Sequence, residues 1–182
     1  ITSVKNEFFL QHTRIDCERA EAAASLSEFI EACRGSVFYD ILKTAESIEA
    51  DHFSIGMMLD SLYYTQLWKP REKLPEAERP CFEKLVGSIA DMLNISWIYR
   101  GKKYFDFPSE IIYTYLIPVN YRLKGDMIKA LVSVSSAEGM EALLRKTRYG
   151  ELFSNLDEKF IEENFMRMET ELSKKIFVNY SK

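Results

Sequence analysis

Residues 80–99 have the sequence PCFEKLVGSIADMLNISWIY. Its apolar side chains recur mostly at steps of three and four residues, the spacing of one face of an α-helix. They are Phe82, Leu85, Val86, Ile89, Leu93 and Trp97. Pro80 is suited to the first turn, where its missing N–H costs no hydrogen bond. The stretch therefore predicts one long helix over residues 80–99 with a buried apolar stripe.

The sequence before this stretch has the same helical spacing three times. Residues 15–33, 36–48 and 52–68 each place apolar side chains on one face and charges elsewhere. Residues 69–80 differ, because three prolines stand among charged residues at five-residue spacing. Prolines so placed are incompatible with a helix interior or a central strand. We expect an exposed connection between antiparallel helices here.

The sequence after residue 99 predicts four further helices. Three are short and span residues 109–115, 123–132 and 136–147, the last preceded by an S-x-x-E capping box at 135–138. The fourth is long, spans residues 157–178 and begins after a capping aspartate, Asp157. Only residues 130–134 are β-branched enough for a strand, and they also fit a helix. About eight helices in all predict an all-α protein.

Composition limits the function classes. The chain of 182 residues has only 7 Gly and 5 Pro, too few turn-forming residues for a many-stranded sandwich or barrel. A net charge of −4 argues against a broad nucleic-acid surface. No stretch approaches the roughly 18 apolar residues that span a bilayer. Cys17, Cys33 and Cys81 form no C-x-x-C motif and predict unpaired thiols in a reducing compartment.

The sequence offers no candidate for catalysis. It lacks the phosphate-binding loop, the nucleophile elbow and the dinucleotide fingerprint. His12 and His52 lie in none of the helical metal-binding motifs, and Cys17 and Cys33 are typical of small core residues. The glutamates of residues 157–178 indicate a solvated face. We therefore predict that the protein is not an enzyme, with no catalytic residue, no cofactor-binding residue and no metal ligand.

Residues 97–121 are rich in aromatic rings interleaved with Arg100, Lys102 and Lys103. An RNA-binding platform would use such a mixture. The negative net charge and the absence of an RNA-binding motif favour another interpretation, in which the rings seal a helix junction. Binding of a protein partner by the exposed tyrosines is the intermediate alternative.

Two stretches 111 positions apart are alike. Residues 29–42 and 140–153 share a helix end, a hydroxyl residue, an aromatic ring, an acid and two apolar residues, so that Ser36 corresponds to Thr147 and Phe38 to Tyr149. A duplicated unit predicts two related bundles, residues 1–116 and 117–182, the second incomplete. Since the chain also begins with Ile1, we expect an internal fragment of a longer protein. Two copies of such a fragment are expected to pair through uncovered apolar helix faces.

Four stretches together resemble a known family. Residues 89–104, IADMLNISWIYRGKKY, have an acid and an asparagine on a long helix before a basic and aromatic end. Residues 109–123 end in YLIPVNYRL, residues 143–149 contain a Thr-x-Tyr element, and residues 59–64 are LDSLYY. In this order they resemble the C subunit of V-type and A-type ATPases and ATP synthases, known as the d subunit in eukaryotic complexes. The family's glycine after Pro118 is replaced, so that turn is expected to differ.

This resemblance implies a function. It implies a funnel-shaped helical protein of three bundles, of which the chain is the middle part. The family forms a non-catalytic rotor subunit of the central stalk, which couples the membrane ring of proteolipid subunits to the stalk during proton or sodium transport or ATP synthesis. The implied partners are the ring and the stalk subunits, and the implied place is peripheral, on the cytoplasmic face of the membrane. The alternative is a helical adaptor or scaffold unrelated to ATPases.

Overall fold

The computed structural model describes residues 14–150. Within this range the chain forms eight α-helices, one 3₁₀ helix and no strand, so the predicted all-α fold is confirmed. The helices are α2 (Cys17–Ala22), α3 (Leu26–Ala32), α4 (Tyr39–Ser47), α5 (His52–Trp68), η1 (Lys69–Lys73), α6 (Arg79–Lys103), α7 (Ser109–Tyr115), α8 (Gly125–Ser133) and α9 (Ala137–Leu144). The helix predicted at 157–178, with Asp157 and its apolar face, lies outside the described residues.

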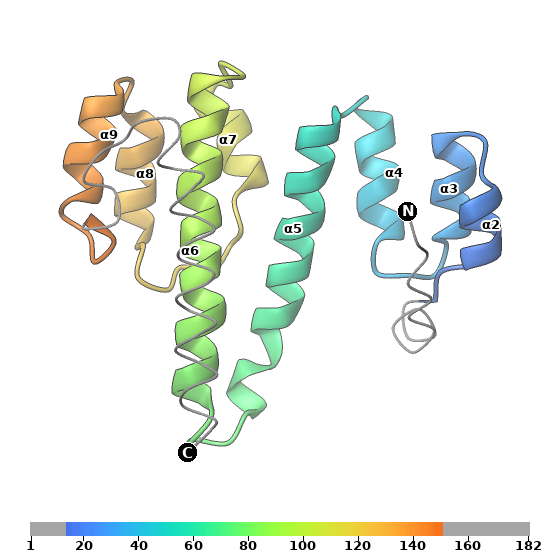
Figure 1. The fold of residues 1–182 in the computed structure, drawn as a ribbon, viewed down its shortest axis with the longest axis horizontal. Helices are drawn as coiled ribbons and strands as arrows, with labels where there is room; N and C mark the ends of the chain where they lie inside the picture. The colour runs from blue at the N-terminus through green and yellow to red at the C-terminus, as the bar shows by residue number, and fades with distance from the viewer. Residues whose placement is uncertain (1–13, 151–182) are drawn as a thin grey trace. The chain divides into compact units, whose positions relative to one another are not determined.

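The chain divides into two compact units, residues 1–62 and residues 63–182, and α5 contributes to both (Figure 1). This division groups residues by their contacts and does not test whether two stretches are related by duplication. The related bundles at 1–116 and 117–182 therefore stay a prediction.

The prediction of one helix over residues 15–33 is wrong. These residues form two helices, α2 and α3, with a break at residues 23–25. The Ser25 hydroxyl accepts a hydrogen bond from the backbone N–H of Glu28 (3.2 Å). The Glu28 carboxylate in turn accepts one from the backbone N–H of Ala24 (2.8 Å). This reciprocal capping satisfies amides that a helix start leaves unpaired, so a new helix begins here.

Most later predicted helices agree closely with the structure, but α4 and α9 are shorter than the helices predicted at 36–48 and 136–147. α5 and α7 have the predicted bounds, α8 begins two residues later than predicted, and residues 69–73 form the short helix η1 within the predicted connection. Pro80 lies in the first turn of α6, as expected. The cap of α9 is displaced by one residue, because the Ser136 hydroxyl, and not that of Ser135, accepts from the N–H of Gly139 (3.0 Å).

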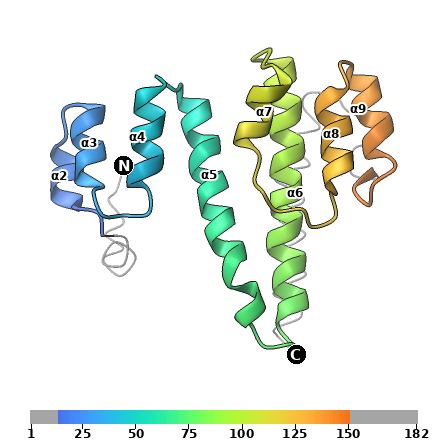
Figure 2. The same cartoon turned by 180° about the vertical axis from the view of Figure 1, so that it is seen from behind.

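Helix α6 is the centre of the second unit. The prediction of a long helix is confirmed and extended to Lys103. Figures 1 and 2 show α7 and the α8–α9 pair beside its C-terminal half, on different sides. The predicted buried stripe is partly wrong, since Val86 and Trp97 are buried but its other four members are only half-buried. Because several helices cover α6, residues 86–99 are buried almost all round, including the polar side chains of Asp91 and Asn94.

The first unit has a small core of its own. Ile30, Cys33 and Leu42 are buried together, and Phe38 and Ile55 are among the half-buried side chains that pack against them. This core joins α3, α4 and the first turns of α5.

Ser36 and Thr147, which the predicted duplication makes equivalent, form the same kind of turn. The Ser36 hydroxyl accepts from the backbone N–H of Phe38 (3.2 Å), and the Thr147 hydroxyl accepts from that of Tyr149 (3.1 Å). The rings that follow differ in their surroundings, since Phe38 is half-buried and Tyr149 is buried and hydrogen-bonded. Superposition of the complete units stays a prediction, because residues 151–182 lie outside the described range.

The three cysteines are free, as predicted. Cys33 is buried and the other two are half-buried, and burial raises the pKa of the Cys33 thiol. Since the thiolate is the reactive form, we expect iodoacetamide to label Cys17 and Cys81 well before Cys33 in the native protein. Mass spectrometry after denaturation without reductant should then show three labels. Fewer labels, or Cys33 reacting first, would contradict this prediction.

Candidate functional site

Asp91 accepts four hydrogen bonds although its side chain is completely buried. Three come from consecutive backbone N–H groups, those of Tyr121 (3.3 Å), Arg122 (2.7 Å) and Leu123 (2.9 Å). The fourth comes from the Tyr149 hydroxyl, 2.8 Å from Oδ2. All four partners are donors, so the arrangement satisfies a carboxylate and would leave donors unpaired without one.

Asn94 lies on the same face of α6 and is also completely buried. Its Oδ1 accepts from the backbone N–H of Ile117 (2.8 Å), and its Nδ2 donates to the carbonyl of the same residue (3.0 Å). Asp91 and Asn94 therefore hold opposite ends of residues 117–123, which connect α7 to α8. We call Asp91, Asn94 and Tyr149 the α6 clamp.

Gly87 completes this face of α6, one turn before Asp91. A Cβ added to Gly87 would lie 2.4 Å from Cγ of Tyr121, far inside van der Waals contact. The glycine thus lets residues 117–123 lie directly against the helix. None of residues 117–123 has a positive φ. The turn after Pro118 therefore forms without the glycine that was expected there from the resemblance.

Replacement of Gly87 by alanine is expected to destabilise the chain by about 1–3 kcal/mol, because the Tyr121 ring must move. Alanine at a helical position is otherwise stabilising, so the sign of the effect is informative. Gly56 in α5 is the matched control, since a Cβ there meets nothing within 4 Å. Urea unfolding should show Gly56→Ala to be stabilising by about 0.5–1 kcal/mol. If the two substitutions changed the free energy of unfolding equally, the close contact between Gly87 and Tyr121 would be refuted.

The electrostatics of the clamp favour a fixed, non-reactive cluster. Burial raises the pKa of the Asp91 carboxyl, and the hydrogen bonds from Arg122, Tyr149, Leu123 and Tyr121 oppose this rise. Burial and the adjacent carboxylate raise the pKa of the Tyr149 hydroxyl, which keeps the phenol protonated and able to donate. The side chains of the cluster are buried, and their polar groups bind backbone or one another.

The clamp joins three stretches that the sequence had suggested separately. Asp91 and Asn94 belong to residues 89–104, the clamped backbone to residues 109–123, and Tyr149 to the Thr-x-Tyr element. Sequence reasoning identified these elements but missed their contact. The available signal was the spacing of Gly87, Asp91 and Asn94 by four and three residues, which puts small and polar residues on one face of an apolar helix.

The other residues considered for chemistry are not brought together. His52 is exposed in the first turn of α5, Cys33 lies in the core of the first unit, and His12 lies outside the described residues. Within residues 14–150, no three His, Cys, Asp or Glu side chains are grouped so that they could hold a metal ion. None of the helices described in this range is both long enough and apolar enough to cross a membrane.

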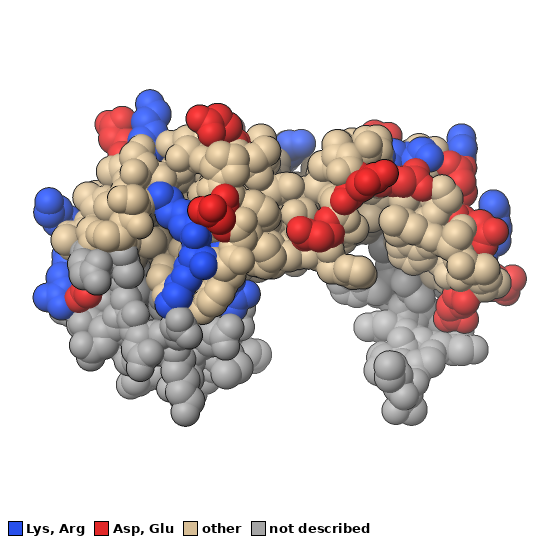
Figure 3. Space-filling view, turned by 90° about the horizontal axis from the view of Figure 1, so that it is seen from above, with Lys and Arg blue, Asp and Glu red and all other residues tan. Residues whose placement is uncertain are grey.

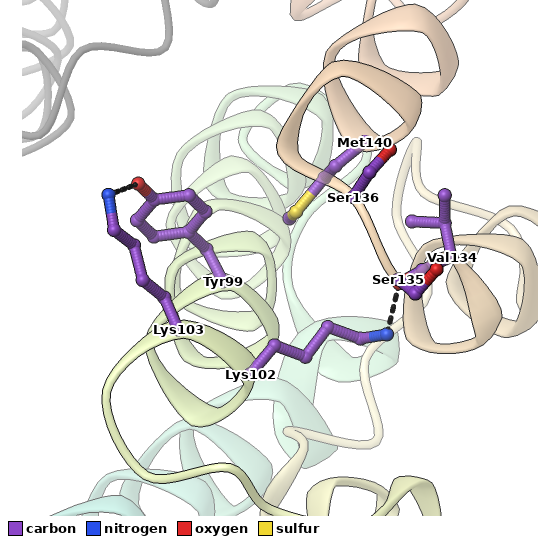
Figure 4. Close-up of a pocket in the computed structure, with 7 residues that line it drawn as sticks. All are labelled: Tyr99, Lys102, Lys103, Val134, Ser135, Ser136 and Met140. Atoms are coloured by element: carbon purple, nitrogen blue, oxygen red, sulfur yellow. Dashed lines mark hydrogen bonds between the residues drawn. The ribbon is translucent and has the colours of Figure 1, made fainter.

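A second feature, a cavity of about 200 Å³, lies at the C-terminal end of α6. Figure 4 shows the residues that line it. Tyr99, Lys102 and Lys103 come from α6, Met140 from α9, and residues 134–136 from the connection before α9.

The aromatic rings of residues 97–121 differ in their burial. Tyr99 is buried, whereas Tyr104 and Tyr113 are exposed. The aromatic segment at 97–121 thus seals a helix junction in part and leaves other rings at the surface.

Comparison with known proteins gives one match. The family model described as ATP synthase (C/AC39) subunit matches residues 3–181, almost the whole chain. Neither the curated proteins nor the solved structures give a significant match.

Proposed function

Because the chain belongs to the ATP synthase (C/AC39) subunit family, we propose that it is a non-catalytic rotor subunit of a V-type or A-type ATPase or ATP synthase. In this role it couples the proteolipid ring to the central stalk during proton or sodium transport or ATP synthesis. The observation that carries the proposal is the family match over residues 3–181. The ordered stretches at residues 59–64, 89–104, 109–123 and 143–149 agree with it.

The α6 clamp supports a mechanical role. A subunit that transmits torque must keep its shape under load, and close packing with satisfied buried polar groups provides stiffness. In the second unit, two buried side chains of the 25-residue helix α6, Asp91 and Asn94, make hydrogen bonds to the backbone of residues 117–123 and so fix this segment to the helix. An open catalytic cleft is not needed for such a function.

The proposal extends to partners and place. We place the protein on the cytoplasmic face of the membrane, bound to the ends of the proteolipid ring and to the other stalk subunits. Two related bundles, residues 1–116 and 117–182, would form part of a funnel-shaped protein. We also propose that two copies of this fragment pair through uncovered apolar helix faces.

Affinity capture tests this function. The full-length protein, tagged in its native cells, is recovered from detergent-solubilised membranes, and the bound proteins are identified by mass spectrometry. A second tagged membrane-associated protein serves as the control for non-specific recovery. We expect enrichment of proteolipid and stalk subunits of a rotary ATPase. A reproducible set of partners without any of these subunits would overturn the proposal and favour a helical adaptor.

A further inference from the structure

The cavity at the C-terminal end of α6 has the size of a single anchoring side chain. Its volume is about 200 Å³. A cavity of about 150 Å³ is enough for a benzene molecule, whereas pockets for drug-sized ligands and cofactors span roughly 300–1,000 Å³. One phenylalanine, leucine or methionine side chain therefore fits the available space, and a nucleotide or larger cofactor does not.

The larger part of the cavity wall is apolar, and Ser135 and Ser136 also line it. Met140 is buried in the middle of α9, Tyr99 is buried on α6, and Val134 is half-buried in the connection between α8 and α9. Thioether and aromatic groups are adaptable surfaces for an apolar ligand. These side chains therefore favour binding of an apolar or aromatic group inside the cavity.

Two positive charges flank the cavity (Figure 4). The Lys102 ammonium donates to the carbonyl of Val134, and the Lys103 ammonium donates to the Tyr99 hydroxyl (2.9 Å) and lies 5.3 Å from the centre of that ring. Burial lowers the pKa of Lys102, so an added anion would stabilise its charged form. The two ammonium groups therefore favour a ligand that carries a carboxylate next to its apolar group.

The surface around this helix end has the composition of a protein contact site. Tyr104 and Phe105 follow directly on α6 and are 55% and 40% exposed. Figure 3, which views the molecule from above, shows a row of basic side chains across this unit. Exposed aromatic rings next to cations, with a pocket for an anchor, are typical of the centre of a protein interface.

We propose that this cavity binds one aromatic or long apolar side chain of a partner protein, at a position flanked by carboxylates that pair with Lys102 and Lys103. The identity of the partner as a subunit of the rotary complex rests on the proposed function, whereas the binding chemistry does not. The partner segment is thus acidic and carries a single apolar anchor.

Methyl NMR of the full-length chain with ¹³C-labelled methionine tests the chemistry. The probes are three blocked tripeptides, Ac-Glu-Phe-Glu-NH₂, Ac-Glu-Ala-Glu-NH₂ and Ac-Lys-Phe-Lys-NH₂. We expect the Met140 methyl signal to shift saturably with the first, and the other two to bind at least about tenfold more weakly, because each loses one of the two interactions. Equal binding of all three peptides, or no shift with the first, would overturn the proposal.

Two variants and a control locate the site. Ser135→Trp puts a large ring at the mouth of the cavity, and Lys103→Glu reverses one of its charges. Lys129→Glu makes the same charge change at an exposed position on α8, away from the cavity. The first two variants should weaken binding of Ac-Glu-Phe-Glu-NH₂ at least about tenfold, and the control by less than about twofold. The other methionine signals report that each variant is folded.

Alternative occupants are distinguished by the same signal. Saturation of the Met140 shift by inorganic phosphate or by laurate at lower concentration than the peptide would overturn the protein-partner assignment.

The peptide experiment and the capture experiment can fail independently of each other. Peptide binding without capture of rotary subunits would refute the function and keep the cavity assignment. Capture of those subunits with no peptide binding would keep the function and refute the cavity assignment.

Discussion

Replacement of Asp91 by asparagine is expected to lower the free energy of unfolding by about 2–4 kcal/mol, because one buried donor would lose its acceptor and the other donors would lose a charged acceptor. The asparagine has nearly the shape of the aspartate, so packing is preserved. With its oxygen at the Oδ2 position, which accepts from Arg122, Leu123 and Tyr149, its amide group would face the backbone N–H of Tyr121, which is also a donor. The three remaining hydrogen bonds would lose the extra strength that a charged acceptor gives them. The loss therefore measures hydrogen bonding at the clamp.

Urea unfolding, followed by circular dichroism, gives the measurement. Asp126→Asn is the matched control, since Asp126 is exposed in the first turn of α8, and it should change stability by at most about 1 kcal/mol. A loss below about 1 kcal/mol for Asp91→Asn would contradict the central role of the carboxylate.

Replacement of Tyr149 by alanine is expected to cost about 3–5 kcal/mol, as other truncations of buried aromatic rings do. Tyr149 is only 4% exposed and packs in the core formed by α6, α8 and α9. The alanine variant removes both the ring and its hydrogen bond to Asp91. Tyr149→Phe keeps the ring and should cost about 1–3 kcal/mol, the effect of the lost donor alone.

The same unfolding experiment separates packing from hydrogen bonding. Tyr113→Ala is the control, because Tyr113 is 42% exposed and should lose at most about 1 kcal/mol. In the double variant Asp91→Asn with Tyr149→Phe, the two losses should not add fully, because the first substitution weakens the hydrogen bond that the second removes. Full additivity would show that Tyr149 and Asp91 act independently.

Most helices were predictable from local spacing. α5, α7 and α8 follow from apolar residues at steps of three and four, and the start of α6 follows from Pro80. The break between α2 and α3 was also encoded locally, in the capping box from Ser25 to Glu28. It was missed because the apolar spacing continues across it. Periodicity alone does not detect a cap that interrupts a helix.

The buried faces of α6 were not predictable in the same way. A periodic stripe shows which side of a helix is most apolar, but burial depends on which other helices pack against it. Because α7 and α8 cover additional sides of α6, Asp91 and Asn94 are buried where a surface helix would expose them. Their partners lie 23 to 58 positions along the chain, beyond any spacing rule.

The cavity was equally inaccessible to sequence reasoning. The sequence drew attention to Lys102, Lys103 and the surrounding aromatic residues, but Val134 and Met140 come from other elements more than thirty positions away. Their meeting depends on how α8 and α9 pack against α6. A pocket of this kind requires the tertiary structure.

Measuring ATP hydrolysis and ATP-driven ion transport in the same membranes tests the proposal that the chain is a non-catalytic coupling subunit. Membranes from cells lacking the full-length protein are compared with membranes from cells in which it is restored. We predict that transport is lost without the protein and recovers with it, while the isolated protein hydrolyses no ATP. Undiminished transport in its absence, or ATP hydrolysis by the isolated protein, would contradict this account.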